Sequence, residues 1–199
     1  MVFVKFAAFL AAALLLLAFG CAAAKINEGI GSDGRAFRGS ASPKVAIYEY
    51  SDFECPYCQK GQPVVESVVR AYQDKGVQLR FMHYPLPSHP RAMPAALAAV
   101  CAEEQGKFWQ MHDRTYANPD ALADSDFESH AKAIGLDMDM YLACLGSVKA
   151  STVVQKDMEQ GKAAGVRATP TFVIGQSVVE GADHAKLSQA IELELARLG

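Results

Sequence analysis

The residues whose types and spacing most directly indicate chemistry are two cysteines that enclose a proline and a tyrosine, in the order Cys55, Pro56, Tyr57, Cys58. The residues before Cys55 are typical of a strand and those after it of a helix, so Cys55 is predicted at a helix N-terminus. There the unpaired backbone N–H groups and the positive end of the helix dipole stabilise a thiolate. Pro56 suits the first helical position because it has no N–H group to leave unpaired. Cys58 lies on the same helix face and can close a small disulfide with Cys55, so the pattern predicts a redox pair.

A C-x-x-C pair also occurs in zinc sites, where a second pair of ligands at similar spacing completes the coordination. The sequence offers no such pair, because Cys101 and Cys144 are isolated and the five histidines form no short-spaced ligand pair. The sequence therefore predicts no metal site and no bound cofactor. The redox group is the Cys55–Cys58 disulfide itself.

The elements that must position these cysteines follow from the hydrophobic periodicity. A strand over 44–50, a helix over 56–75 and a strand over 77–84 predict a βαβ unit with two parallel strands. Five helical segments come next, and the chain ends in two strands and a helix. The predicted bounds are 91–105, 107–117, 124–134, 137–145 and 147–164 for the helical segments, 171–174 and 178–180 for the strands, and 183–198 for the last helix, with Asp183 as its N-cap. The predicted fold class is α/β with a central mixed sheet, in the order βαβ, helical insertion over about 91–165, ββα.

With these elements, the sequence resembles the DsbA-like branch of the thioredoxin superfamily, exported thiol–disulfide oxidoreductases with a helical domain inserted into a thioredoxin fold. The resemblance places that domain over 44–199. Four separated motifs carry it. The run 48–58 is similar to the family's first strand, loop and active-site helix, and Pro63 matches the proline inside that helix. Glu49 falls where the family has a buried acid beneath the disulfide, and the run 167–172 matches the loop whose cis proline faces the cysteines.

The resemblance implies roles for three further residues. Glu49 is expected to be partly buried, to have a raised pKa and to help move a proton to or from Cys58. The alternative for Glu49 is a strand residue whose side chain reaches solvent. The bond between Thr169 and Pro170 is expected to be cis, which turns the Thr169 backbone outward to pair with an extended substrate segment. The identity of residue 169 does not decide the direction of the reaction.

Cys101 and Cys144 both fall in the helical insertion, and their apolar neighbours indicate that both face the interior. In an exported protein they are expected to form a structural disulfide. In the chain-entropy model, closing a loop of 43 residues contributes about 4 kcal/mol. The alternative is two buried free thiols.

The aromatic and histidine side chains outside these motifs are interpreted as structural. By their helical spacing, four residues of the insertion are assigned mainly to its core rather than to a substrate groove: Phe108, Trp109, Met111 and Tyr116. His83 and His89 are likewise interpreted as structural.

The N-terminus is typical of an export signal over residues 1–20, with Lys5 before an uninterrupted apolar stretch. The residues around Cys21 resemble a bacterial lipobox, in which the signal is cut before a cysteine that becomes lipidated. Cleavage after Ala24, which discards Cys21, and a retained anchor are the alternatives. Residues 21–43 are rich in Gly, Ser and Ala and are interpreted as a flexible tether. The protein is therefore expected to be exported to the periplasm or cell envelope, and lipidation of Cys21 would anchor it to a membrane.

The net charge of −3 gives no basic excess, so a nucleic-acid partner is not expected. The partners implied by the resemblance are exported proteins that contain cysteines, and a membrane redox partner that reoxidises or reduces the Cys55–Cys58 pair. Because the insertion is typical of oxidases and no separate dimerisation domain is predicted, the expected activity is the introduction of disulfides. A reductase or isomerase of the same fold, and a non-catalytic binding or chaperone-like protein, are the alternatives.

Overall fold

The computed structural model describes residues 25–199. The expected signal over 1–20 and the lipidation of Cys21 lie outside the described residues. The described chain forms one six-stranded sheet in the order β1-β2-β4-β3-β5-β6. Strands β3 and β4 are parallel, and every other neighbouring pair is antiparallel, so the predicted mixed sheet is confirmed. The strands are β1 (Glu28–Ile30), β2 (Ala36–Gly39), β3 (Val45–Ser51), β4 (Val77–His83), β5 (Thr171–Ile174) and β6 (Ser177–Glu180).

The helices lie close to their predicted positions. They are α1 (Pro56–Tyr72), followed by a 3-10 turn (Gln73–Lys75), α2 (Ala92–Glu103), α3 (Phe108–Ala117), α4 (Asp124–Ala133), α5 (Met138–Leu145), α6 (Val148–Ala163) and α7 (His184–Leu198). Among the described residues, no helix has the length and apolar character needed to cross a membrane.

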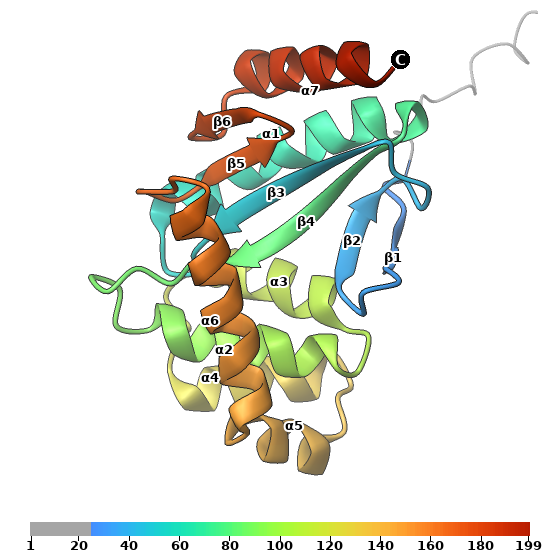
Figure 1. Ribbon diagram of the computed structural model, residues 1–199. Coiled ribbons are helices and arrows are strands. Elements are labelled where there is room, and N and C mark those ends of the chain that lie inside the picture. The colour runs from blue at the N-terminus through green and yellow to red at the C-terminus, as the bar shows by residue number, and fades with distance from the viewer. Residues whose placement is uncertain (1–24) are drawn as a thin grey trace, which may run out of the picture.

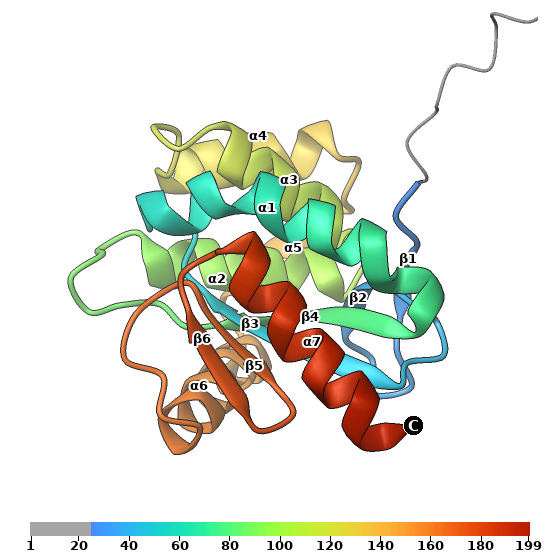
Figure 2. The ribbon, with the colours of Figure 1, turned by 90° about the horizontal axis from the view of Figure 1, so that it is seen from above.

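Helices cover both faces of the sheet (Figure 1, Figure 2). Helices α1 and α7 pack against each other on one face, and α6 packs on the other. The alternation of β3 explains this, because successive side chains of a strand point to opposite faces. Glu49 points toward α1, where it meets Gln62, whereas Tyr50 packs with Met82 and with Met158 of α6. The acid expected beneath the active-site helix is therefore on the correct face.

The helical insertion forms a lobe beside the sheet and is built around α2 (Figure 1). Helix α2 contacts α3, α4, α5 and α6, and its alanine-rich sequence lets those helices approach closely. Phe108, Trp109, Met111 and Tyr116 are all buried in the core that joins the lobe to the sheet, as expected from their spacing.

The expectation of a flexible tether over 21–43 is wrong for residues 25–43. Strands β1 and β2 form a hairpin that pairs with the free edge of β4 and extends the sheet. Ionic contacts hold the hairpin in place. Arg35 binds Asp157 of α6, and Arg38 is only 5% exposed. Two strands this short, stabilised by arginines and joined by a glycine-rich turn, produce no apolar alternation in the sequence. The folded domain therefore begins before the predicted boundary at residue 44.

Candidate active site

Cys55 and Cys58 lie at the start of α1, directly after the central strand β3. Cys55 is the N-cap residue, with extended backbone angles, and Pro56 occupies the first helical position. Both cysteines are free thiols here. Cys55 is 4% exposed and Cys58 is fully buried, whereas Tyr57 is 72% exposed and marks the protein surface beside them.

The two thiols have opposite pKa shifts. The hydrogen bond from the Cys58 thiol lowers the pKa of Cys55 to about 5, against an opposing effect of burial. The Thr169 side chain and the backbone N–H groups of Tyr57 and Cys58 lower it further. Burial raises the pKa of Cys58 far above its usual range. At neutral pH Cys55 is therefore the thiolate and Cys58 holds the proton.

The loop before β5 closes over Cys55. The Thr169–Pro170 peptide bond is cis. The Cys55 sulfur lies 3.4 Å from the Thr169 carbonyl oxygen, to which the thiol donates a hydrogen bond when it is protonated. Gly61 of α1 lies against the segment after β6, because a Cβ atom there would stand 2.7 Å from the Ala182 Cβ and 3.9 Å from the Pro170 Cγ. That segment is joined to the cis-proline loop by a hydrogen bond from the Gly181 N–H to the Pro170 carbonyl oxygen at 2.8 Å. The structure thus brings Thr169 and Pro170 to the cysteines.

Glu49 lies beneath the start of α1 and is fully buried. Burial raises the pKa of its carboxyl to about 7, while hydrogen bonding by Ser51 and Gln62 and the charge of Arg38 oppose the shift. Gln62 donates a hydrogen bond to Glu49 Oε1 at 3.1 Å, and Oε2 has no hydrogen-bond partner among the described residues. The solvent-exposed alternative for Glu49 is excluded. A carboxyl with this pKa exchanges its proton near neutral pH, as an acid–base group for Cys58 requires.

Sequence reasoning gave no role to Asp52, the buried partner of His89, which it interpreted as structural. Asp52 is buried, accepts hydrogen bonds from the backbone N–H groups of Glu54 and Leu86, and pairs with His89 Nδ1 at 2.8 Å. Burial lowers the pKa of His89, but the hydrogen bond and charge of Asp52 outweigh it, so the net shift is upward. Asp52 thereby ties the loop before Cys55 to the loop after β4. The position of Asp52, three residues before Cys55, is the sequence feature that could have marked it as part of the site.

Tyr116 was assigned to the core, and its ring does pack there, but its hydroxyl belongs to the site. The Tyr116 hydroxyl lies 3.0 Å from Ser51 Oγ and donates to the Asp52 carbonyl oxygen at 3.3 Å. An open groove between α1 and α3 reaches this region and is lined in part by Gln59, Gln62 and Tyr116. The periodicity of a single helix could not predict this contact, because Ser51 and Tyr116 come from different elements.

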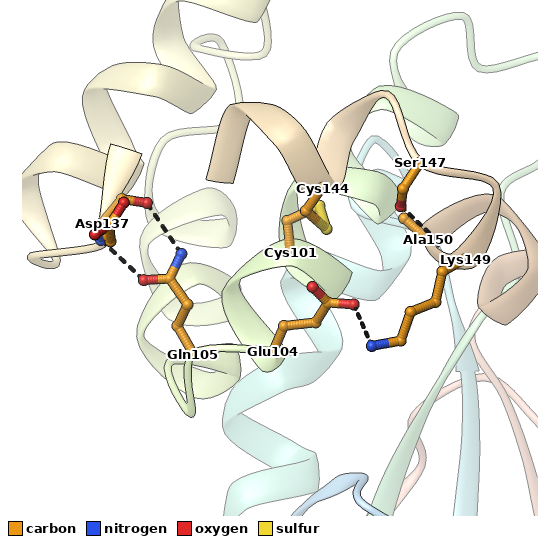
Figure 3. The surroundings of a disulfide bond; sticks show 8 residues. All are labelled: Cys101, Glu104, Gln105, Asp137, Cys144, Ser147, Lys149 and Ala150. Atoms are coloured by element: carbon orange, nitrogen blue, oxygen red, sulfur yellow. Dashed lines mark hydrogen bonds and ion pairs between the residues drawn. A yellow bond between two sulfur atoms is a disulfide. The ribbon is translucent and has the colours of Figure 1, made fainter. Parts of the chain in front are cut away.

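Cys101 and Cys144 are joined by a disulfide within the helical lobe, between α2 and α5 (Figure 3). Polar contacts flank it. Gln105 and the Asp137 backbone exchange two hydrogen bonds, at 2.8 and 3.1 Å, and Lys149 pairs with Glu104 at 2.8 Å. The disulfide and its neighbours hold the ends of α2, α5 and α6 together, away from the elements that carry the C-x-x-C pair.

No group of three or more His, Cys, Asp or Glu side chains in the described part of the chain is placed to hold a metal ion. The groups that the described site offers for chemistry are its two thiols, the buried carboxyl and the surrounding hydroxyls.

A family model described as thioredoxin matches residues 32–193, so this chain belongs to the thioredoxin family. Its inserted helices and its similarity to solved structures make it a DsbA-like member of that superfamily. A thioredoxin-like oxidoreductase from Silicibacter pomeroyi DSS-3 superposes with a TM-score of 0.74 at 24% identity, over 83% of this chain and 94% of that one. DsbA2 from Pseudomonas aeruginosa gives a TM-score of 0.67 at 27% identity, over 79% and 92%.

Curated relatives include a Na(+)/H(+) antiporter, NhaA 3 from Salinispora tropica, which is 36% identical over 138 residues. The match covers 69% of this chain but 21% of the antiporter, so this chain spans about a fifth of that relative. The fold, the C-x-x-C pair and the solved neighbours together support a thiol–disulfide oxidoreductase of the DsbA type.

Proposed function

We propose that this protein is an exported thiol–disulfide oxidoreductase that introduces disulfides into extracytoplasmic proteins through Cys55 and Cys58. The observation that carries the proposal is the pair of opposed pKa shifts at the start of α1. A thiol with a pKa of about 5 is a good leaving group in thiol–disulfide exchange. A buried neighbour with a raised pKa keeps its proton until it reacts.

In the proposed reaction a substrate thiolate attacks the Cys55 sulfur of the Cys55–Cys58 disulfide. The bond between the two cysteines breaks, and Cys58 leaves with the electron pair and takes up a proton. A second substrate thiolate then attacks the substrate sulfur of the mixed disulfide, and Cys55 leaves as a thiolate. The substrate loses two electrons to form its disulfide, and the C-x-x-C pair gains them.

The low pKa of Cys55 also favours the oxidase direction. Each unit by which the thiol pKa lies below ambient pH stabilises the reduced form by about 1.4 kcal/mol, equivalent to about 30 mV. The protein is then a stronger oxidant of its substrates. The Pro56–Tyr57 pair, which resembles that of glutaredoxins, favours the alternative of a reductase.

Substrate recognition is proposed at the cis-proline loop. The Thr169 backbone lies beside the Cys55 sulfur, and an extended substrate segment pairs with it as an added strand. Tyr57 lies on the surface next to that segment and contributes an exposed aromatic ring. The partners are unfolded or extended proteins that contain cysteines, and a membrane redox partner that reoxidises the pair.

Equilibration of the pure protein with glutathione buffers tests the direction of the reaction. An oxidase is expected well above the thioredoxin value of about −270 mV, toward the DsbA value of about −120 mV. A potential at the thioredoxin end contradicts the oxidase and indicates a reductase. Cys58→Ser is expected to trap the substrate on Cys55 as a mixed disulfide, and a Cys55→Ser variant with full activity would indicate a non-catalytic binding protein.

Export and anchoring are proposed from residues 1–24 alone. The mass of the mature N-terminus tests them, because a diacylglycerol-modified Cys21, cleavage after Ala24 and an uncleaved N-terminus give three different masses. Only the first result supports a lipid anchor at Cys21.

A further inference from the structure

Two hydroxyl groups, those of Ser51 and Tyr116, are buried together with the carboxyl of Glu49 and the thiol of Cys58 and lie 3.0 Å from each other. Glu49 and Ser51 are two residues apart on β3, so their side chains point to the same face of the sheet. Ser51 is 1% exposed and belongs to the same buried region as Glu49 and Cys58. The resemblance to the thioredoxin superfamily predicted the acid and the thiol but no protein group between them.

The Ser51 side chain lies near enough to both groups to influence their pKa values, and the Glu49 Oε2 atom is free of other hydrogen-bond partners among the described residues. Hydrogen bonding by its side chain opposes the rise in the pKa of Glu49 and also the rise in the pKa of Cys58. A hydroxyl can accept one proton while it donates another, which a carboxylate or a thiol cannot do at the same moment. The Ser51 hydroxyl can therefore pass a proton between the Glu49 carboxyl and the Cys58 thiol.

Tyr116 holds the Ser51 hydroxyl in position. Its hydroxyl lies 3.0 Å from Ser51 Oγ, and its backbone carbonyl accepts a hydrogen bond from Gln59 Nε2 at 2.9 Å, which fixes α3 against α1. The single hydrogen of the Tyr116 hydroxyl can be donated to the Asp52 carbonyl oxygen at 3.3 Å or to Ser51 Oγ at 3.0 Å, and when it is donated to Ser51 Oγ the hydrogen of Ser51 is free to point toward Glu49 or Cys58. Tyr116 is thus a positioning residue for Ser51.

We propose that the Ser51 hydroxyl carries the proton between Cys58 and Glu49, that Tyr116 orients it, and that the groove between α1 and α3 connects Glu49 with solvent. The inference rests on the proposed function and assigns a route to its proton transfer. Gln62 donates a hydrogen bond to Glu49 and also lines the groove, so it lies where the proposed proton route meets the groove.

When the Cys55–Cys58 bond forms, the proton of Cys58 Sγ passes to Ser51 Oγ while the Ser51 proton passes to the Glu49 carboxylate. The Cys58 thiolate attacks the Cys55 sulfur of a mixed disulfide, and the bond between Cys55 and its partner breaks. The partner leaves as a thiolate with the electron pair. In the oxidase direction the same proton path runs in reverse, from Glu49 through Ser51 to the departing Cys58.

Other charged and titratable groups surround the relay on several elements. Arg38 of β2 acts on Glu49, and Asp52 acts on Tyr116. Glu66 and Asp113 line the groove itself. Because Glu49 must be ionised to accept the proton, the rate of the Cys58 step is expected to rise with pH through the pKa of Glu49, near 7.

The test separates the two cysteines by mixing the reduced protein with one equivalent of 4,4′-dithiodipyridine. The attack of Cys55 releases the first 4-thiopyridone, and the attack of Cys58 on the resulting mixed disulfide releases the second. The first phase reports Cys55 alone, whereas the second requires the proton of Cys58 to leave. Both phases are followed by absorbance in a stopped-flow instrument across the neutral pH range.

Ser51→Ala and Glu49→Gln are each expected to slow the second phase by about a hundredfold, within the range of general acid–base catalysis. Both are expected to remove the inflection near pH 7 while the first phase stays fast. Because the two groups act in one path, the double variant is expected to be no slower than either single variant. An unchanged second phase in Ser51→Ala, multiplicative losses in the double variant, or an equal slowing of both phases would each overturn the proposal.

Tyr116→Phe provides a second test that does not depend on the folding of Ser51→Ala. It is expected to slow the second phase and to spare the first, but by less than the loss of Ser51. The matched control is Tyr141→Phe, since the Tyr141 hydroxyl is buried in α5 without a hydrogen-bond partner in the described chain. Equal second phases in the two tyrosine variants would contradict the role of Tyr116. A protein that shows both phases but does not oxidise reduced substrates would contradict the proposed function and leave the relay supported.

Discussion

At the scale of single residues, Cys55 and Cys58 show how position alone separates two identical side chains. Cys55 precedes the first turn of α1, where backbone N–H groups and the Cys58 thiol donate to its sulfur. Cys58 lies one turn further on, where the helix faces the interior and burial dominates. The proposed roles of Cys55 as nucleophile and Cys58 as resolving cysteine therefore follow from the local geometry of one helix end.

Gly61 is the residue at which α1 meets the segment after β6, which the Gly181 N–H joins to the Pro170 carbonyl oxygen of the cis-proline loop. Gly61→Ala places a Cβ atom 2.7 Å from the Ala182 Cβ, which cannot move without its backbone. The expected overpacking cost of about 1–3 kcal/mol exceeds the gain in helix propensity of about 1 kcal/mol. The variant is expected to unfold at lower denaturant concentration and to react more slowly at Cys55, since the Thr169 carbonyl is displaced.

The matched control is Gly146→Ala, because no described atom lies within 4 Å of a Cβ there and the backbone φ of −85° is ordinary. Its stability is expected to change by less than about 0.5 kcal/mol. Equal stabilities for the two alanine variants would show that the contact at Gly61 is not tight.

At the scale of elements, the sequence predicted what has a periodic pattern and missed what depends on contacts between elements. The strand over 44–50 and the helix over 56–75 were placed because their apolar residues recur at strand and helix spacing. The hairpin of β1 and β2 was missed because its strands are three and four residues long and its stabilising partners lie far along the chain. The contact of Ser51 with Tyr116 was missed for the same reason, with 65 residues between them.

The hairpin is fixed to the helical lobe by Arg35. Its guanidinium donates to both carboxylate oxygens of Asp157, at 2.8 and 3.1 Å, and lies 3.4 Å from Glu103. Arg35→Met is expected to cost about 3–5 kcal/mol, because it leaves two buried carboxylates without a counter-charge. Burial already raises the pKa of Asp157 and of Glu103. The loss is therefore expected to be greatest at pH 8 and smaller at pH 5, where these carboxyls can be protonated.

The control for Arg35→Met is Lys75→Met. Lys75 pairs with Glu192 at 2.8 Å, but both side chains are more than half exposed, and such pairs contribute little. Urea unfolding at both pH values is the measurement. If Arg35→Met is no less stable than Lys75→Met, the hairpin is not anchored through this ion pair.

At the scale of the whole molecule, two buried titratable groups make the free energy of unfolding depend on pH in opposite ways. The folded-state pKa of Glu49 is raised to about 7 from 4.5. The stabilising contribution of the buried Glu49 carboxyl to the free energy of unfolding is fully present below its unfolded-state pKa and is lost as pH rises through about 7. The folded-state pKa of His83 is lowered well below 6.5 by burial, by the charge of Arg35 and by His112. The stabilising contribution of the neutral His83 ring to the free energy of unfolding is present above its unfolded-state pKa and is lost as pH falls.

The pH dependence of stability in the reduced protein and in two variants separates these effects. The free energy of unfolding of Glu49→Gln is expected to match that of the wild type near pH 4 and to exceed it above pH 7 by roughly 3 kcal/mol, since about 2.5 pKa units are removed at 1.36 kcal/mol each.

His83 has no hydrogen-bond partner on either ring nitrogen among the described residues and packs against Phe81 and Phe108. His83→Phe is therefore expected to lose less stability than the wild type between pH 6.5 and pH 4, whereas His184→Gln, at an exposed position on α7, is expected to follow the wild type. A Glu49→Gln curve parallel to that of the wild type from pH 4 to pH 8 would mean that the Glu49 carboxyl titrates normally in the folded protein, and the proton route through Ser51 would then lack its acceptor.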